Sequence, residues 1–270
     1  MRLSIDGISY HVDVQGSGEA VMLLHGFTGN GGTWKETINI LSGSFRTIAV
    51  DLPGHGQTDA PADLAKYEME AVAAHLLELL NRLKIDHVHL LGYSMGGRLA
   101  LGMSILYPER FKSLMLESSS PGLRTKVERE QRIMADQQLA EKILKDGIES
   151  FVDYWENIPL FSTQKALPVE KQRAIRQSRL KNRAKGLANS LLGMGTGRQP
   201  SWWDRLQELQ VPVLVICGEL DVKFCRIAKE MDKRIPDSRL VILEGAGHAL
   251  HVEEPMKFGT IVKEFLMEIV

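Results

Sequence analysis

The segment Gly92-Tyr93-Ser94-Met95-Gly96-Gly97 decides the fold. It follows the apolar run 87–91 and opens the stretch 95–106, which is rich in small and apolar residues and stops before Pro108. A serine flanked by glycines at such a junction is typical of a nucleophile elbow, a sharp strand-to-helix turn that lifts the hydroxyl into a cleft. Glycines two residues before and after the serine permit so tight a turn. We therefore predict that Ser94 is a nucleophile at the positive end of a helix.

Short apolar runs recur along the chain and alternate with helical patterns. Because the runs lack polar alternation, they indicate strands buried on both faces. The segment 69–83 has one apolar helical face, and Asp6-Gly7 predicts a tight hairpin near the N-terminus. Alternating strands and helices imply parallel crossovers, so we predict a mostly parallel, eight-stranded sheet flanked by helices. Besides the hairpin, the predicted strands are 20–24, 45–50, 87–91, 111–116, 211–216 and 240–243.

One long segment, 121–200, contains no strand-like run. It reads as a helical cap inserted after the sixth strand, with residues 1–120 and 201–270 forming the core. The cap holds 15 Lys and Arg against 9 Asp and Glu, whereas the core holds 18 against 25. An insertion here would hang over the carboxyl ends of the strands, where open α/β sheets bind ligands. We expect the basic cap to help hold an anionic substrate; the alternative is a solvated helical face.

Composition and charge narrow the partners. The 270 residues carry a formal net charge of −1, so no overall field favours nucleic acid or an acidic membrane. The two cysteines, Cys217 and Cys225, suggest neither a metal site nor a disulfide framework. The first residues lack the apolar core of a signal peptide, and no apolar run is long enough to span a bilayer. We expect a cytoplasmic protein without a metal site, either a monomer or a small homo-oligomer.

A serine needs a neighbour that takes its proton. His248 follows the last predicted strand, in a loop expected to reach Ser94, and His251 is the substitute. The acid should lie between serine and histidine in the chain. Asp221, just after the strand 211–216, fits this order and would orient the imidazole. Glu219 lies beside it, and Glu117, which ends an earlier strand, is another position for the acid.

Two backbone amides are candidates for an oxyanion hole. One belongs to Met95, directly after the nucleophile, and the other to Phe27, in the loop 25–29 after a buried strand. Such N–H groups stabilise the negative charge that develops in the transition state. We interpret His25 as a brace for this loop, and the turn 51–56 as structural.

The motifs together resemble the α/β-hydrolase superfamily over essentially the whole chain, and the fold expected is the α/β-hydrolase fold. They comprise Leu24-His25-Gly26-Phe27, the turn 51–56, the elbow, Gly218-Glu219-Leu220-Asp221 and Gly247-His248. More specific segments resemble the 2-succinyl-6-hydroxy-2,4-cyclohexadiene-1-carboxylate synthases of menaquinone biosynthesis. They are Gly92–Arg98, Gly195–Trp203 and Gly218–Phe224. This resemblance implies a lyase that eliminates pyruvate from a succinyl, enolpyruvyl cyclohexene carboxylate, without a metal or an organic cofactor.

The resemblance also implies which residues bind the substrate: Arg98, Arg132 and Arg179, with Tyr93 and Trp155 as pocket walls. Guanidinium forks suit a substrate that carries several carboxylates. The alternatives are an internal ion pair for Arg98 and a solvated helix face for the other two arginines. The position of Arg179 is crowded by other cations, namely Arg176, Lys181 and Arg183.

Under this interpretation Ser94, activated by His248, removes a ring proton, the enolate oxygen enters the oxyanion hole, and pyruvate leaves. The same triad could instead run a carboxylesterase or a carbon–carbon bond hydrolase acting on a small carboxylated substrate. A ligand receptor that retains the triad is a third possibility.

Overall fold

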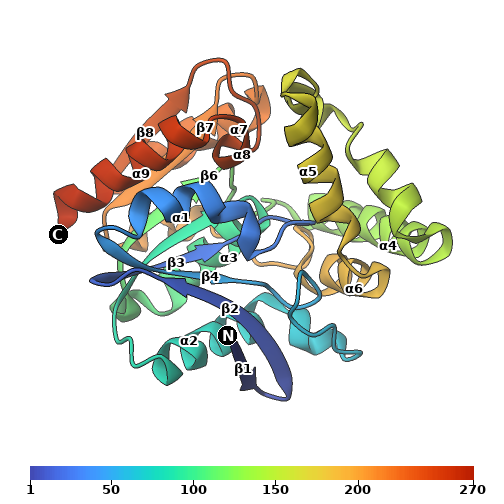
Figure 1. Ribbon diagram of the computed structural model, residues 1–270, viewed down its shortest axis with the longest axis horizontal. Helices are drawn as coiled ribbons and strands as arrows, with labels where there is room; N and C mark the ends of the chain where they lie inside the picture. The colour runs from blue at the N-terminus through green and yellow to red at the C-terminus, as the bar shows by residue number, and fades with distance from the viewer.

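The computed structural model describes residues 1–270 and consists of one eight-stranded sheet, flanking helices and a helical cap (Figure 1). The strand order is β1-β2-β4-β3-β5-β6-β7-β8. Only the pairings of β1 with β2 and of β2 with β4 are antiparallel. The predicted α/β-hydrolase fold is confirmed. The strands are β1 (Arg2–Ile5), β2 (Ile8–Gln15), β3 (Glu19–Leu24), β4 (Phe45–Val50), β5 (Val88–Tyr93), β6 (Phe111–Glu117), β7 (Val213–Gly218) and β8 (Ser238–Leu243).

The N-terminal hairpin turns at Asp6 and Gly7, whose φ angles are 48° and 72°. Two successive residues with positive φ are what a two-residue hairpin turn of the common twisted type requires, and Asp-Gly provides them at low cost. Further along the chain, β7 begins at Val213 rather than at Val211, because Pro212 has no backbone N–H to contribute to a ladder.

Helices cover both faces of the sheet. All six residues of β5 are buried, as its uninterrupted apolar character predicts. Successive residues point to opposite faces, so Leu90 packs in a cluster with α2 and α3, whereas Leu91 packs in a cluster with α9. Helix α7 joins the first cluster and α1 the second. These helices are α1 (Lys35–Leu41), α2 (Met69–Arg82), α3 (Met95–Leu106), α7 (Val222–Asp232) and α9 (Pro255–Ile269).

The cap lies in the chain between β6 and β7, and its regular elements are all helices. In Figure 1 its three helices, yellow-green to gold, stand together beside the sheet. They are α4 (Lys126–Trp155), α5 (Val169–Leu180) and α6 (Ala184–Met194). α4 and α6 share a small apolar core that includes Ile143, Phe151 and Leu187. No helix of the protein combines the length and the apolar character that crossing a membrane requires.

The topology fixes where a site can form. From β3 the chain passes to β4 on one side and later to β5 on the other, so the winding direction reverses at β3. The carboxyl ends of the strands near such a reversal leave a crevice between diverging loops. Ser94 follows β5, next to β3 in the sheet, and therefore lies at this crevice.

Candidate active site

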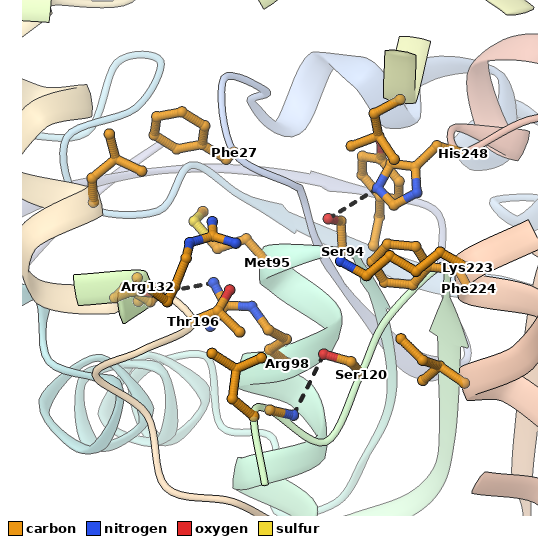
Figure 2. A pocket seen from close by; sticks show the side chains of 18 of the residues that line it. Phe27, Ser94, Met95, Arg98, Ser120, Arg132, Thr196, Lys223, Phe224 and His248 are labelled. Atoms are coloured by element: carbon orange, nitrogen blue, oxygen red, sulfur yellow. Dashed lines mark hydrogen bonds between the residues drawn. The ribbon is translucent and has the colours of Figure 1, made fainter. Parts of the chain in front are cut away.

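Three side chains from distant parts of the chain meet at the carboxyl end of the sheet. Nε2 of His248 lies 3.2 Å from Oγ of Ser94, and Nδ1 of His248 lies 2.6 Å from Oδ2 of Asp221. His248 and Asp221 are buried. When Nδ1–H donates to the carboxylate, Nε2 can accept the serine proton, so the arrangement is that of a Ser-His-Asp triad. Figure 2 shows the contact between Ser94 and His248 at one side of the hollow.

The elbow holds Ser94 in a strained backbone conformation, with φ 50° and ψ −105°. Non-glycine residues pay roughly 1–3 kcal/mol for such angles, and this strain is common at active sites. Close packing keeps the turn in place. A Cβ atom on Gly96 would lie 2.2 Å from the carbonyl oxygen of Leu24 in the neighbouring strand. Only glycine allows this approach of helix α3 to β3.

The substitute histidine and acid pair with each other rather than with Ser94. Nδ1 of His251 lies 2.9 Å from both carboxylate oxygens of Glu117, and both side chains are buried. The ring of Tyr93 packs against both His251 and His248, with centroid distances of 4.7 and 5.4 Å. The structure therefore contains a second, separate acid–histidine pair, and Tyr93 contacts the histidine of each pair.

His25 holds the loop that carries Phe27 in place through two hydrogen bonds. The Nδ1 of His25 bonds the carbonyl of Gly26 at 2.8 Å, and its Nε2 accepts the backbone N–H of Leu52 at 3.0 Å. Burial lowers the pKa of His25, which keeps the ring neutral and able to accept. Phe27 and Met95 both line the hollow beside Ser94. This placement is compatible with an oxyanion hole formed by their backbone amides.

Ser94 and His248 open into a cavity of about 220 Å³ between the core and the cap (Figure 2). Its walls are mainly apolar and include Trp155, Phe161 and Phe224. Three cations also line it: Arg98, Arg132 and Lys223. No cluster of three or more His, Cys, Asp or Glu side chains is placed to hold a metal ion. The cavity thus combines apolar walls with positive charge, which suits a small organic anion.

Two of the three predicted arginines face this cavity. Arg98 is buried, and its nitrogens donate to the side-chain oxygen of Gln199 and, at 2.9 Å, to the carbonyl of Met194. Burial lowers the pKa of Arg98 to about 9, which leaves it charged at neutral pH. Arg132 is exposed, and its Nε donates to Asp136 at 2.8 Å. Burial raises the pKa of Asp136. Because both hydrogen-bond partners of Arg98 are neutral, no internal ion pair holds its guanidinium.

Arg179 does not line this cavity, but it lines a neighbouring one that shares Phe27, Tyr93 and Phe161 with it. Substrate binding by Arg179 therefore stays a prediction. Its guanidinium carbon stacks 4.7 Å from the ring centre of Phe161, which is itself a cavity wall, and its Nη2 donates to Gln164 at 3.0 Å. The alternative of a solvated helix face is wrong, since Arg179 is buried. Tyr93 and Trp155 line the cavity.

Several lining or supporting residues were not predicted from the sequence. Lys223 and Phe224, which belong to the family-like segment Gly218–Phe224, both line the cavity, and the ring centroids of Phe224 and His248 lie 4.7 Å apart. Asp136 could have been found, because it follows Arg132 at the i, i+4 spacing that joins side chains on a helix. Gln199 carried no such signal, since its partner Arg98 is distant in sequence.

Comparisons with known proteins agree with this geometry. Residues 19–255 match the α/β hydrolase fold family. A Bacillus subtilis (strain 168) protein, provisionally named 2-succinyl-6-hydroxy-2,4-cyclohexadiene-1-carboxylate synthase, is 52% identical over 98% of this chain and 97% of its own. The structure of MenH from S. aureus superposes with a TM-score of 0.92 at 36% identity, covering 96% of this chain and 98% of that one. A malate-bound thermophilic esterase from Thermogutta terrifontis gives 0.89 at 30% identity, covering 100% and 99%.

The family match spans most of the chain, and the Bacillus relative matches it nearly from end to end. The triad stands where the elbow motif requires it, under a helical cap. The chain therefore belongs to the α/β hydrolase fold family and, within it, to the 2-succinyl-6-hydroxy-2,4-cyclohexadiene-1-carboxylate synthases.

Proposed function

We propose that this protein eliminates pyruvate from 2-succinyl-5-enolpyruvyl-6-hydroxy-3-cyclohexene-1-carboxylate to give 2-succinyl-6-hydroxy-2,4-cyclohexadiene-1-carboxylate, a step of menaquinone biosynthesis. One observation carries the proposal: a Ser94–His248 pair at 3.2 Å opens into a cavity that Arg98 and Arg132 also line. The substrate bears three carboxylates, and a cationic cavity of this kind would attract them. The similarity to named synthases supports the same conclusion.

The reaction starts with loss of a ring proton. The carbon that bears the succinyl ketone is the most acidic ring position, because the resulting carbanion is delocalised onto the ketone oxygen. Ser94, after passing its own proton to His248, takes the ring proton. Asp221 stabilises the imidazolium that forms. The amides of Phe27 and Met95 would donate to the enolate oxygen.

The enolate then collapses through the ring double bond and breaks the carbon–oxygen bond to the enolpyruvyl group. The leaving oxygen receives a proton that His248 supplies through the same site, and the released enol becomes pyruvate. No covalent intermediate on Ser94 is needed. The apolar walls formed by Trp155, Phe161 and Phe224 keep water from the enolate.

We further propose a cytoplasmic location and action on a small anionic substrate, by a monomer or small homo-oligomer that needs neither nucleic acid nor a membrane. The two thiols, Cys217 and Cys225, are free although their sulfurs lie 3.4 Å apart, which favours a reducing compartment. Fractionation of cells that produce the protein, and its mass in solution, would test this proposal.

A direct assay tests the proposed chemistry. Purified protein is given the enolpyruvyl substrate, and pyruvate is followed with lactate dehydrogenase; a panel of aryl esters is tested in parallel. We expect pyruvate release far faster than ester cleavage, and its loss in Ser94→Ala. Fast ester cleavage without pyruvate would contradict the proposal.

A serine hydrolase acting on a carboxylated substrate is the second candidate. The specific observation in its favour is the similarity to the malate-bound esterase, which shares this fold over the whole chain. A hydrolase would form an acyl group on Ser94, which rapid quenching and mass spectrometry would detect as a mass increase of the protein. The lyase gives no such increase.

A further inference from the structure

Arg98 is a buried cation, and the two groups that accept its hydrogen bonds are both neutral. Only 8% of the residue is exposed, and the carboxylate that acts on it through space, that of Asp136, is bonded to Arg132 instead. Its two hydrogen bonds go to the amide oxygen of Gln199 and to the carbonyl of Met194. A guanidinium has five N–H donors, so three remain without a protein partner. Figure 2 shows Arg98 beside Thr196 and Ser120, across the hollow from His248.

Gln199 is itself fixed by its surroundings. It is 3% exposed, and its Nε2 donates to the carbonyl of Pro200 at 3.4 Å. Gly122, with φ +91°, packs against the amide, and a Cβ on this glycine would lie 2.6 Å from Nε2 of Gln199. These contacts direct the amide nitrogen away from Arg98 and the amide oxygen toward it. The side chain therefore presents one acceptor of fixed orientation to the guanidinium.

The choice of a neutral acceptor has a consequence for charge. Proteins usually pair a buried cation with an acid. Here the acid nearby, Asp136, binds the exposed Arg132 at 2.8 Å instead of the buried Arg98. Glutamate has the same shape as glutamine and would form a charged bond to Arg98, but it would neutralise the guanidinium and draw its N–H groups away from the cavity. With glutamine, no hydrogen-bonded partner neutralises Arg98, and Asp136, which already binds Arg132, acts on it only through space.

We propose that Gln199 is a positioning residue that aims Arg98 into the cavity while leaving its positive charge available to a carboxylate of the substrate. The proposal rests on the anionic substrate of the proposed function and adds the residue that sets specificity for it. It also gives a role to the segment 195–203, the segment between α6 and the core that contains Gln199.

Four variants test this role: Gln199→Glu, Gln199→Met, Arg98→Met and, as a matched control, Gln207→Glu, which adds the same charge at an exposed position outside the cavity. Two quantities are measured besides the melting temperature. One is the Kd for succinate by calorimetry, succinate serving as a probe for the succinyl arm. The other is kcat and KM for pyruvate release.

We expect Gln199→Glu to raise the Kd for succinate and the KM by about tenfold or more with a small change in kcat, since a charged contact is lost. Gln199→Met leaves the charge of Arg98 unchanged and removes only the acceptor that orients the guanidinium. We therefore expect a smaller rise in the Kd and the KM. Arg98→Met should raise the Kd and the KM as much as Gln199→Glu does. Gln207→Glu should have the Kd and the KM of the wild type.

Three results would overturn the inference. Gln199→Glu could bind succinate as the wild type does while Arg98→Met does not. Gln199→Glu and Gln199→Met could lose affinity equally and in step with a lower melting temperature, which would indicate a structural role. The wild type could fail to bind succinate at all. If succinate binding follows the expected order but no pyruvate is released, the proposed function fails and the role of Gln199 stands.

Discussion

At the scale of single residues, the carboxylate of Asp221 has two functions: it caps a helix and it orients the catalytic histidine. Its Oδ2 receives Nδ1–H of His248 at 2.6 Å, while its Oδ1 receives the backbone N–H of Phe224 at 3.2 Å. The second bond caps the N-terminus of α7. The carboxylate is thus held by a helix end before it orients the imidazole, so the histidine has one tautomer and one direction.

Asp221→Asn tests this orientation. The amide keeps the shape and the cap, but its nitrogen faces an imidazole that then adopts the wrong tautomer. We expect kcat for pyruvate release to fall roughly 10³–10⁴-fold, as such a change does in serine proteases, with an unchanged melting temperature. Asp204→Asn, at an exposed position, is the control. A fall of less than tenfold would mean that another group orients His248.

His55 predicts how stability depends on acid. It is fully buried; Nδ1 bonds the carbonyl of Pro53 at 3.1 Å, and Nε2 has no partner. Burial, with a smaller contribution from His25, lowers the pKa of His55 from 6.5 to about 3. Below pH 6.5 the unfolded chain binds a proton at His55 that the folded chain does not bind. The contribution of His55 to the free energy of unfolding is therefore fully present above pH 6.5 and is lost as the pH falls toward 3.

Between pH 7 and pH 5 this single group should remove about 2 kcal/mol from the free energy of unfolding. His55→Asn keeps the donor to Pro53 but cannot titrate, so its loss over the same interval should be smaller by that amount. Urea unfolding at the two pH values measures the difference. His87→Asn, at an exposed histidine, should show the full wild-type loss. Equal losses in wild type and His55→Asn would disprove the assignment.

At the scale of elements, the elbow between β5 and α3 is the part least tolerant of change. Gly96→Ala would place a Cβ 2.2 Å from a strand carbonyl, so the helix must shift away from the sheet. We expect destabilisation of about 3 kcal/mol or more, together with loss of activity. Gly43→Ala is the matched control, because nothing lies within 4 Å of the position that its Cβ would take, and it should change stability by less than about 0.5 kcal/mol. Chemical denaturation of both variants provides the comparison.

The strands and core helices could be predicted from the sequence because their patterns are local. The run before Ser94 lacks polar alternation and is buried throughout, and α3 has the predicted bounds Met95–Leu106. The triad followed from the order of motifs along the chain. Each of these signals lies within a few residues of its element, so one sequence suffices to read it.

The cap was harder to predict, for a physical reason. Helix α5 consists largely of charged and polar residues and has no clear apolar face that would show its orientation, so the stacking of Arg179 on Phe161 left no pattern. The bond between Arg98 and Gln199 joins residues 101 positions apart. Contacts of this kind depend on how the cap docks, which a local pattern does not encode.

At the scale of the whole molecule, the charge is distributed unevenly. The segment 121–200 has an excess of Lys and Arg, and the remainder has an excess of Asp and Glu. We therefore expect a polyanionic substrate to be attracted toward the cap side of the cavity. Salt weakens such attraction, because the screening length falls from about 10 Å at 0.1 M to about 3 Å at 1 M.

We expect KM for the enolpyruvyl substrate to rise several-fold as sodium chloride increases over this range, while kcat stays nearly constant, because the reacting groups lie within a cavity with mainly apolar walls. Steady-state assays at four salt concentrations measure the slope of KM against sodium chloride concentration. Arg98→Met should have a shallower slope than the wild type. A KM that does not change with salt would show that the cap charges do not guide the substrate.

The position of the cap in the chain also has a consequence for biosynthesis. A ribosome completes Ser94 and the strand β6 before it makes the cap, and only afterwards β7, Asp221 and His248. Until β7 emerges, the edge of β6 that will pair with it stays open, which exposes the nascent chain to aggregation. The hydroxyl also has no imidazole beside it during this interval, so translation must pass the final strand before turnover can begin.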